Sequence, residues 1–237
     1  MANPDYLDVT YADDRLPPSA YPERLAGWLH TEVFGKPGVL VDVGCGRGEY
    51  LRAFAAKGYD VIGIDSAASA GRLAGQLRVD VADVERDGLP LPDRSVDYVY
   101  SKSVIEHLQR PVAMLAECRR VLRPGGTAVI MTPSWRHQSK VFYEDFTHVT
   151  PFTRNGLQDA MTVSGFSGVD ARIFWQLPYL WRHPWLLGPT RMLGRLPLPY
   201  RPWNSAPWPE GLNKLIRFSK EAMLLAIGRR PPDGAPA

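Results

Sequence analysis

Cysteine is scarce in this sequence, and so are long apolar runs. The chain of 237 residues contains two cysteines, Cys45 and Cys118, which cannot form a disulfide framework and fit a reducing compartment. No stretch approaches the roughly 18 apolar residues that span a bilayer. The first twenty residues contain four aspartates and no apolar run, which is unlike a signal peptide. These absences predict a cytoplasmic protein.

The sequence also lacks a strong excess of either charge. It has 28 Lys and Arg residues against 25 Asp and Glu residues, which gives a formal net charge of +3. So small an excess does not indicate nucleic-acid binding, and we expect no nucleic-acid partner. Apolar residues make up 45% of the chain and charged residues 22%, which is typical of a folded globular protein.

Apolar periodicity predicts strands that alternate with helices. Short apolar runs bounded by glycine or polar residues indicate strands, and apolar residues at helical spacing indicate helices. The predicted strands cover residues 38–43, 61–64, 77–81, 96–101, 126–132 and 166–174. The predicted helices cover residues 20–34 (with Ser19 as N-cap), 49–57, 111–122 and 153–164. Such alternation favours an α/β fold with a mostly parallel sheet.

The composition changes in the last third of the chain. Residues 175–209 contain five of the seven tryptophans, eight prolines, four arginines and no acidic residue. So many prolines exclude regular helix or sheet throughout this stretch. A helix over residues 209–219 would have one apolar face, formed by Leu212, Leu215 and Ile216.

The strongest local signal is the glycine-rich segment VDVGCGRG at residues 41–48. Glycines between a strand and a helix let the backbone approach a ligand and direct helix N–H groups at it, although a tight turn without a ligand would need them too. The G-x-G-x-G spacing differs from the G-x-G-x-x-G fingerprint of nicotinamide enzymes. Asp42, two residues before Gly44, would repel a pyrophosphate and suits a cationic amino group. A nicotinamide oxidoreductase is therefore the weaker interpretation.

Two further carboxylates follow predicted strands. Asp65 ends the second strand, 21 residues after Gly44, where a carboxylate can bind a ribose diol. Asp83 lies just past the third strand and could accept from an adenine amino group, with Asp80 as the competing residue.

These residues belong to four segments that together resemble a known family. The segments are VDVGCGRGEYL at 41–51, VIGID at 61–65, DVERDGLPLPDRSVDYVYSKSVIEHL at 83–108 and ECRRVLRPGGTAVIMTP at 117–133. The chain resembles a class I S-adenosylmethionine-dependent methyltransferase of the small-molecule or sugar type, over roughly residues 38–174. The resemblance implies a Rossmann-like, seven-stranded, mostly parallel sheet with helices on both faces and a C-terminal antiparallel hairpin.

The resemblance also implies S-adenosyl-L-methionine as the cofactor and assigns roles to individual residues. The implied cofactor-binding residues are Asp42 and Gly44 at the methionyl amino group, Gly46 where the cofactor lies close, Asp65 at the ribose, Asp83 and Val84 at adenine, and Ser101 on the methionyl side.

The family's last strand accounts for the apolar run near the C-terminus and completes a division of the chain. We expect an N-terminal arm over 1–18, a methyltransferase core over 19–174, an insertion over 175–220, the last core strand over 221–230 and a tail over 231–237. A structured loop as long as this insertion usually serves function. Three interpretations stay open: a substrate lid, a peripheral membrane contact, and a homodimer contact.

Methyl transfer to a hydroxyl requires a group that removes the hydroxyl proton. His107 follows the fourth strand, and His148 lies in a polar-aromatic loop after the fifth strand. We predict His148 as the general base, because the acceptor would approach from that loop, and His107 as the second catalytic candidate. Asp145 could orient His148 or bind a substrate hydroxyl, and Tyr143 could line the pocket. We expect no metal site, because no cluster of acids can be assembled from these loops.

The sequence therefore predicts an enzyme that O-methylates a small molecule, a sugar or a lipid-linked acceptor such as a glycolipid intermediate. N- or C-methylation is the first alternative, because no motif encodes the acceptor. A non-catalytic S-adenosylmethionine-binding protein is the other, although none of its cofactor motifs is broken.

Overall fold

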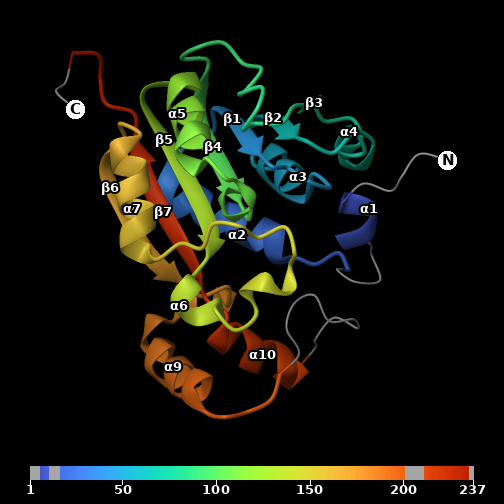
Figure 1. The fold of residues 1–237 in the computed structure, drawn as a ribbon, viewed down its shortest axis with the longest axis vertical. Coiled ribbons are helices and arrows are strands. Elements are labelled where there is room, and N and C mark those ends of the chain that lie inside the picture. Colours follow the sequence, from blue (N-terminus) through green and yellow to red (C-terminus); the bar gives the residue numbers. More distant parts are fainter. Residues whose placement is uncertain (1–5, 11–16, 201–210, 235–237) are drawn as a thin grey trace.

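A seven-stranded sheet forms the centre of the molecule in the computed structural model, which describes residues 6–10, 17–200 and 211–234 (Figure 1). The strands are β1 (Val39–Val43), β2 (Asp60–Asp65), β3 (Val79–Val81), β4 (Val96–Lys102), β5 (Leu122–Pro133), β6 (Ser167–Phe174) and β7 (Met223–Arg229). Their order is β3-β2-β1-β4-β5-β7-β6. All neighbours pair in parallel except β7, which is antiparallel to β5 and β6. This arrangement confirms the predicted fold, including the antiparallel hairpin.

The helices connect the strands or lie at the ends of the sheet. They are α1 (Tyr6–Thr10), α2 (Tyr21–Leu29), α3 (Glu49–Ala55), α4 (Ala70–Ala74), α5 (Pro111–Val121), α6 (Trp135–Gln138), α7 (Arg154–Val163), α8 (Pro178–Arg182), α9 (Leu187–Arg195) and α10 (Gly211–Lys220). A π-helical turn, His30–Phe34, extends α2. The N-cap of α2 is Ala20 and not Ser19 as predicted, although the Ser19 hydroxyl accepts a long hydrogen bond of 3.4 Å from the N–H of Tyr21, the first residue of the helix. No helix in the described part of the chain is long and apolar enough to cross a membrane.

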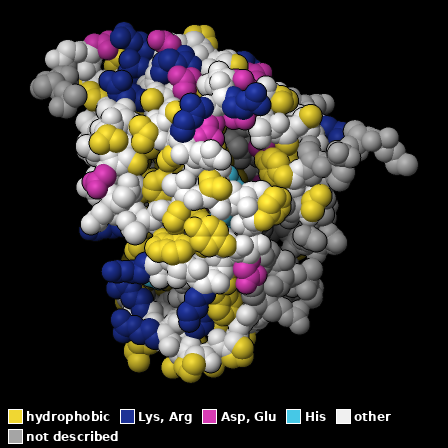
Figure 2. All heavy atoms as spheres, in the orientation of Figure 1, with side chains coloured by type: hydrophobic (Ala, Val, Ile, Leu, Met, Phe, Trp, Pro, Cys, Tyr) yellow, Lys and Arg dark blue, Asp and Glu magenta, His cyan; other side chains and the backbone are white. Residues whose placement is uncertain are grey.

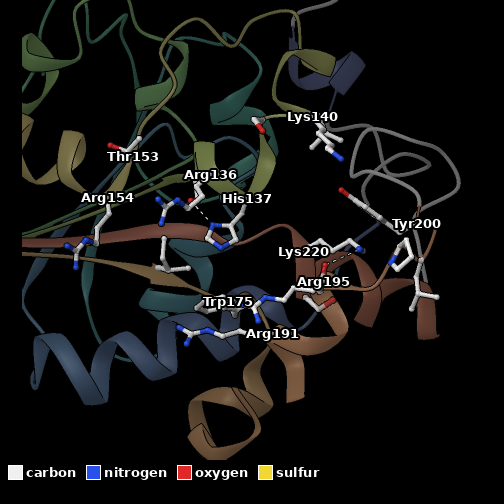
Figure 3. Close-up of a pocket in the computed structure, with 18 of the residues that line it drawn as sticks. Arg136, His137, Lys140, Thr153, Arg154, Trp175, Arg191, Arg195, Tyr200 and Lys220 are labelled. Atoms are coloured by element: carbon white, nitrogen blue, oxygen red, sulfur yellow. Dashed lines mark hydrogen bonds between the residues drawn. The ribbon is translucent and has the colours of Figure 1, made fainter. Parts of the chain in front are cut away.

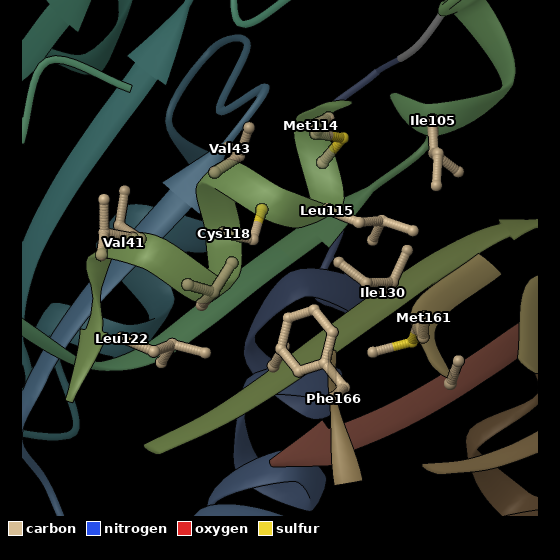
Figure 4. Packing of buried hydrophobic residues seen from close by; sticks show 14 of the residues in the cluster. Val41, Val43, Ile105, Met114, Leu115, Cys118, Leu122, Ile130, Met161 and Phe166 are labelled. Atoms are coloured by element: carbon tan, nitrogen blue, oxygen red, sulfur yellow. The ribbon is translucent and has the colours of Figure 1, made fainter. Parts of the chain in front are cut away.

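Both faces of the sheet are covered, which explains why its strands are apolar on both sides. On one face, α5 and α7 pack against the sheet, and Figure 4 shows Leu115 of α5 beside Ile130 of β5 in the same apolar cluster as Val41 of β1. On the other face, α2 and α3 pack against Leu40, the next residue of β1. Because successive side chains of a strand point to opposite faces, β1 contributes to both cores.

The predicted insertion begins and ends at one point of the sheet. Phe174, at the end of β6, pairs with Met223, at the start of β7, and Met223 also pairs with Pro133, at the end of β5. Helices α8, α9 and α10 therefore emerge at the carboxyl end of β5 and lie below the sheet in Figure 1. Trp181 of α8 attaches the insertion to the core. The centroid of its ring lies 5.3 Å from the ring centroid of Phe174 and 5.8 Å from that of Trp28.

The apolar face predicted for α10 is only partly correct. Ile216 is buried, and Leu215 packs against an apolar cluster, but Leu212 is 68% exposed. The part of α10 that contacts the core is its C-terminal end, next to β7, where Phe218 is buried. Leu212 lies in the first turn, away from that contact.

Removing the Trp181 ring should destabilise the protein. We expect Trp181→Ala to lower the free energy of unfolding by about 2–4 kcal/mol, because truncating a large packed aromatic leaves a cavity. Trp185 is the matched control: it lies in the same insertion but is 74% exposed, so Trp185→Ala should change stability by less than about 0.5 kcal/mol. Urea denaturation followed by circular dichroism measures both, and equal effects would contradict the proposed attachment.

Candidate functional site

The carboxyl ends of β1, β2 and β4 meet at a turn that only glycines can form. Gly44, Gly46 and Gly48 have φ angles of 77°, 52° and 73°, in the region that favours glycine. A Cβ on Gly44 would lie 2.1 Å from Cγ2 of Val104. Gly44 is thus fixed both by its backbone angle and by a close neighbour, while the role of this turn at the cofactor stays a prediction.

Asp42 is a buried carboxylate beneath this turn. Its Oδ2 atom has no hydrogen-bond partner among the described residues. Burial, together with the carboxylate of Asp65, raises the pKa of Asp42 to about 8, while Lys102 acts in the opposite direction. An ammonium group bound at Oδ2 would supply the missing partner and charge. Asp42 therefore fits the role predicted for it at the amino group of S-adenosylmethionine.

Asp65 is the last residue of β2, and both of its carboxylate oxygens accept hydrogen bonds. Oδ1 accepts from the Ala67 N–H at 2.8 Å, and Oδ2 accepts from the Gly46 N–H at 2.8 Å. The Tyr6 hydroxyl of α1 lies 2.8 Å from Oδ1 and 3.0 Å from Oδ2. A carboxylate offers about four acceptor positions, and the two N–H groups and the Tyr6 hydroxyl take up most of them, so the Tyr6 hydroxyl competes with a ribose diol for Asp65. Tyr6 was not predicted, because no motif links the N-terminal arm to the end of β2.

The remaining predicted cofactor residues lie along the same edge of the sheet. Asp83 Oδ1 accepts from the backbone N–H of Glu85 at 3.0 Å. Its competitor Asp80 forms an ion pair with Arg78 at 2.7 Å, which favours Asp83 for the adenine role. Val84 packs against the core. Ser101, at the end of β4, is buried and donates to the carbonyl of Val43 at 2.9 Å, so its hydroxyl joins β4 to β1.

A cavity of about 530 Å³ opens beside this edge and contains both predicted histidines. One wall comes from the core and includes Lys102, Glu106, His107, Asp145 and His148. Another wall comes from the insertion and includes Tyr179, Lys214 and Phe218. The structure thus brings His107, His148 and Asp145 together, and it covers them with α8 and α10. We refer to this space as the acceptor cavity, after the methyl acceptor that the sequence analysis predicts near His148.

In each histidine of the acceptor cavity, Nδ1 donates a hydrogen bond to an oxygen atom of the protein. His148 Nδ1 lies 2.6 Å from the Phe142 carbonyl, which can only accept, so Nδ1 carries the proton. His107 Nδ1 lies 2.8 Å from Thr147 Oγ1, and this hydroxyl donates to Asp145 Oδ1 at 2.6 Å. Burial and the nearby His148 lower the pKa of His107 to about 4, which keeps His107 neutral. Both rings therefore have an Nε2 lone pair available to accept a proton.

The loop that carries His148 does not bring Tyr143 to the cavity. Tyr143 is 59% exposed, and its ring packs against Phe142 and Trp135 outside the acceptor cavity. Asp145, two residues further on, does line the cavity, with Oδ2 at 4.0 Å from His148 Nε2. The role of Asp145 stays a prediction. Tyr143 was expected to line the cavity, but it lies outside the cavity.

Glu106 is a site residue that sequence analysis overlooked, although it directly precedes His107. It is fully buried: Oε2 accepts from Thr132 Oγ1 at 2.9 Å, and Oε1 has no partner among the described residues. Burial raises the pKa of Glu106 to about 7. Glu106, His107 and His148 each offer one ligand atom within 4.8 Å of the others, a set that could hold a metal ion. The predicted absence of a metal therefore stays a prediction.

Comparisons with known proteins agree with this geometry. Residues 41–130 match the family model described as a methyltransferase domain. A protein of Mycolicibacterium smegmatis, named as a probable S-adenosylmethionine-dependent methyltransferase, is 41% identical over 97 residues, which is 40% of this chain and 38% of that protein. The chain thus covers well under two thirds of this relative's own length. The ubiquinone biosynthesis O-methyltransferase of Roseobacter denitrificans is 27% identical over 76% of this chain and 78% of that protein.

Among solved structures, methyltransferases have a fold similar to that of this chain. The crystal structure of an S-adenosylmethionine-dependent methyltransferase from Archaeoglobus fulgidus superposes with a TM-score of 0.65. It is 21% identical, and the match covers 95% of this chain and 100% of that one. The fold is that of Rossmann-like methyltransferases. Taken together, the family model over residues 41–130, the relatives and the fold make this chain similar to class I S-adenosylmethionine-dependent methyltransferases, whose cofactor is S-adenosyl-L-methionine.

The affinity for the cofactor should depend on pH through Asp42. Its pKa is raised to about 8, so it is mostly protonated at pH 6 and becomes an ammonium-binding carboxylate as the pH rises. We expect affinity for S-adenosylhomocysteine to increase by about tenfold or more between pH 6 and pH 8. Calorimetry at several pH values measures this. The Asp42→Asn variant should bind S-adenosylhomocysteine more weakly than the wild type, and its affinity should change less between pH 6 and pH 8. An affinity that rises as steeply with pH in this variant as in the wild type would contradict the assignment.

The contact between Tyr6 and Asp65 should oppose cofactor binding. Tyr6→Phe removes the hydroxyl that occupies both oxygens of Asp65, so affinity for S-adenosylhomocysteine should increase by about 2- to 10-fold, the net value of one hydrogen bond. Asp65→Ala should instead weaken binding by about 1.5–3 kcal/mol, because it removes a charged acceptor. Calorimetry tests both variants, with circular dichroism as the control for folding. Weaker binding by Tyr6→Phe would show that the hydroxyl assists the cofactor.

Proposed function

We propose that this protein transfers the methyl group of S-adenosyl-L-methionine to a hydroxyl oxygen of a small molecule, a sugar or a glycolipid intermediate. The observation that carries the proposal is the pair of imidazole rings in the acceptor cavity. Their ring centroids lie 4.7 Å apart, and hydrogen bonds from Nδ1 leave both Nε2 atoms as proton acceptors. A methyltransferase that acts on a hydroxyl needs such a base, whereas an uncharged amine already carries its lone pair.

Each residue of the acceptor cavity has a separate role in the proposed methyl transfer. The bound cofactor supplies a methyl group activated on a sulfonium, so the protein mainly has to position the acceptor and remove its proton. His148 Nε2 takes the hydroxyl proton, and the Phe142 carbonyl, as acceptor for Nδ1–H, stabilises the imidazolium that forms. Asp145 Oδ2, at 4.0 Å from Nε2, adds a favourable negative charge. His107 stays neutral and lines the same cavity.

The insertion is proposed to select the acceptor. Gln176, Tyr179, Lys214 and Phe218 all line the acceptor cavity, and they come from both ends of the insertion. Among them, Lys214 supplies a cation that could meet an anionic acceptor group. The predicted cofactor residues lie in the core instead, so the two functions are separable in the chain. The Roseobacter relative is an O-methyltransferase by name, which supports oxygen as the acceptor atom.

Replacing His148 should slow methyl transfer and leave cofactor binding intact. We expect His148→Ala to reduce the single-turnover rate by about 100-fold or more, the usual contribution of a general base. His107→Ala should lower the rate and also weaken cofactor binding. Rapid-quench single-turnover assays from pH 6 to pH 9 with a hydroxylated acceptor measure the rate, and calorimetry measures the affinity. A near-normal rate for His148→Ala across this range would leave His148 a binding residue.

A chelator distinguishes the base from a metal ligand. If His148 and His107 act as free imidazoles, dialysis against EDTA should leave turnover unchanged, because no metal would be needed. Loss of turnover that Zn²⁺ or Mn²⁺ restores would instead assign Glu106, His107 and His148 to a metal site and overturn the general-base proposal.

A further inference from the structure

A second, larger cavity lies between the insertion and the end of β5. Its volume is about 1260 Å³. It is lined by five segments of the chain: residues 134–141 around α6, 153–155 at the start of α7, 173–175 at the end of β6, 191–200 in and after α9, and 219–220 at the end of α10. Figure 3 shows Arg136, Arg154, Arg191, Arg195 and Lys220 around this space. It shares no lining residue with the acceptor cavity.

The charge of this cavity is strongly one-sided. Six of its lining residues are Lys or Arg, and none of the described lining residues is Asp or Glu. The six are Arg136, Lys140, Arg154, Arg191, Arg195 and Lys220. The whole chain has nearly equal numbers of basic and acidic residues, so this segregation is not a matter of composition. Figure 2 shows Lys and Arg side chains gathered on the lower part of the face, where α9 lies in Figure 1.

These cations are not neutralised within the described part of the molecule. Arg136, Lys140, Arg191 and Arg195 form no ion pair with a described carboxylate, and Lys220 donates to the carbonyls of Gly194 and Leu196 instead. Arg191 and Arg195 are also four residues apart on α9, where like charges repel each other. An anion bound among these side chains would relieve this repulsion.

Two uncharged features of the cavity also favour an anion. Trp175 is 8% exposed and lines the cavity, and its indole N–H is buried without an acceptor in the described structure. The guanidinium of Arg191 lies 4.9 Å from the Trp175 ring centroid, which holds this cation at the wall. The first turn of α7, with Thr153 as its N-cap, adds the positive end of a ten-residue helix. The missing partner of a buried donor is an acceptor atom, as a phosphate oxygen would be.

We propose that this cavity binds a phosphate-bearing ligand with more than one phosphate group, such as a diphosphate. Guanidinium groups match phosphate oxygens in geometry, and a single phosphate would leave most of the six cations unpaired. The diphosphate of a soluble nucleotide and the diphosphate of a lipid have the same recognition chemistry. The proposal does not depend on the acceptor atom of methyl transfer, because it concerns different residues.

Inorganic pyrophosphate is the direct probe. On the full chain at constant ionic strength, it should bind saturably by calorimetry and raise the thermal unfolding midpoint. The double variant Arg136→Gln/Arg191→Gln should bind it at least about tenfold more weakly, because two charged hydrogen-bond donors are lost. Trp175→Phe keeps an aromatic ring but removes the N–H donor and should weaken binding several-fold. Both arginines are exposed, so the fold should tolerate their replacement.

Arg182→Gln is the matched control, since Arg182 is an exposed arginine of the same insertion outside the cavity. It should bind pyrophosphate like the wild type. Binding of S-adenosylhomocysteine, measured in parallel, should be unchanged in all variants and reports on the core separately. Phosphatidylcholine vesicles containing a polyprenyl diphosphate form the second arm, assayed by flotation. Binding to pyrophosphate without binding to the vesicles indicates a soluble source, and binding to the vesicles, with or without pyrophosphate binding, indicates a lipid headgroup. The proposal is overturned if neither binds, or if the double variant binds like the wild type.

Discussion

Two buried carboxylates at neighbouring strand ends are the constraint around which this site is organised. Asp42 and Asp65 lie at or near the carboxyl ends of adjacent parallel strands, and burial together with the Asp65 carboxylate raises the pKa of Asp42. Backbone N–H groups of the glycine turn and of Ala67 satisfy Asp65. Nothing within the described chain satisfies Asp42 Oδ2. Asp65 thus has hydrogen-bond partners within the protein, whereas Asp42 keeps one oxygen without a partner in the described structure, as expected if it binds the amino group of the cofactor.

The parts of this structure that follow from local sequence were predictable. The central strands β1, β2 and β4 are short runs rich in apolar residues, and the turn from Gly44 to Gly48 needs residues that tolerate positive φ, so both are visible in the sequence. The cofactor carboxylates were predictable because parallel strands all end at one edge. The pairing of β7 with β5 and β6 was not encoded locally: the run 222–229 suited a helix equally well, and the family resemblance decided it.

The unpredicted features all depend on contacts between distant segments. Tyr6 meets Asp65 across 59 residues of sequence, and no periodicity records such a contact. Glu106 was visible in its motif, but its importance comes from complete burial, which only the packed structure shows. The cationic cavity joins Arg136, Arg154 and Arg191, which are ordinary surface residues when each is considered alone. A charge distribution that is balanced along the chain can therefore be strongly unbalanced in space.

The adjacency of Phe174 and Met223 has a consequence for the evolution of this fold. Because these residues are paired across β6 and β7, the two ends of the insertion are held together by the sheet whatever lies between them. The closure entropy of a loop grows only slowly with its length, by about 0.6 kcal/mol for each doubling. Segments of very different length and composition can therefore be exchanged at this position without altering strand register. If the insertion selects the acceptor, as proposed, replacing this one segment would change the acceptor, and chimaeric proteins joined at these two residues could be made for the same reason.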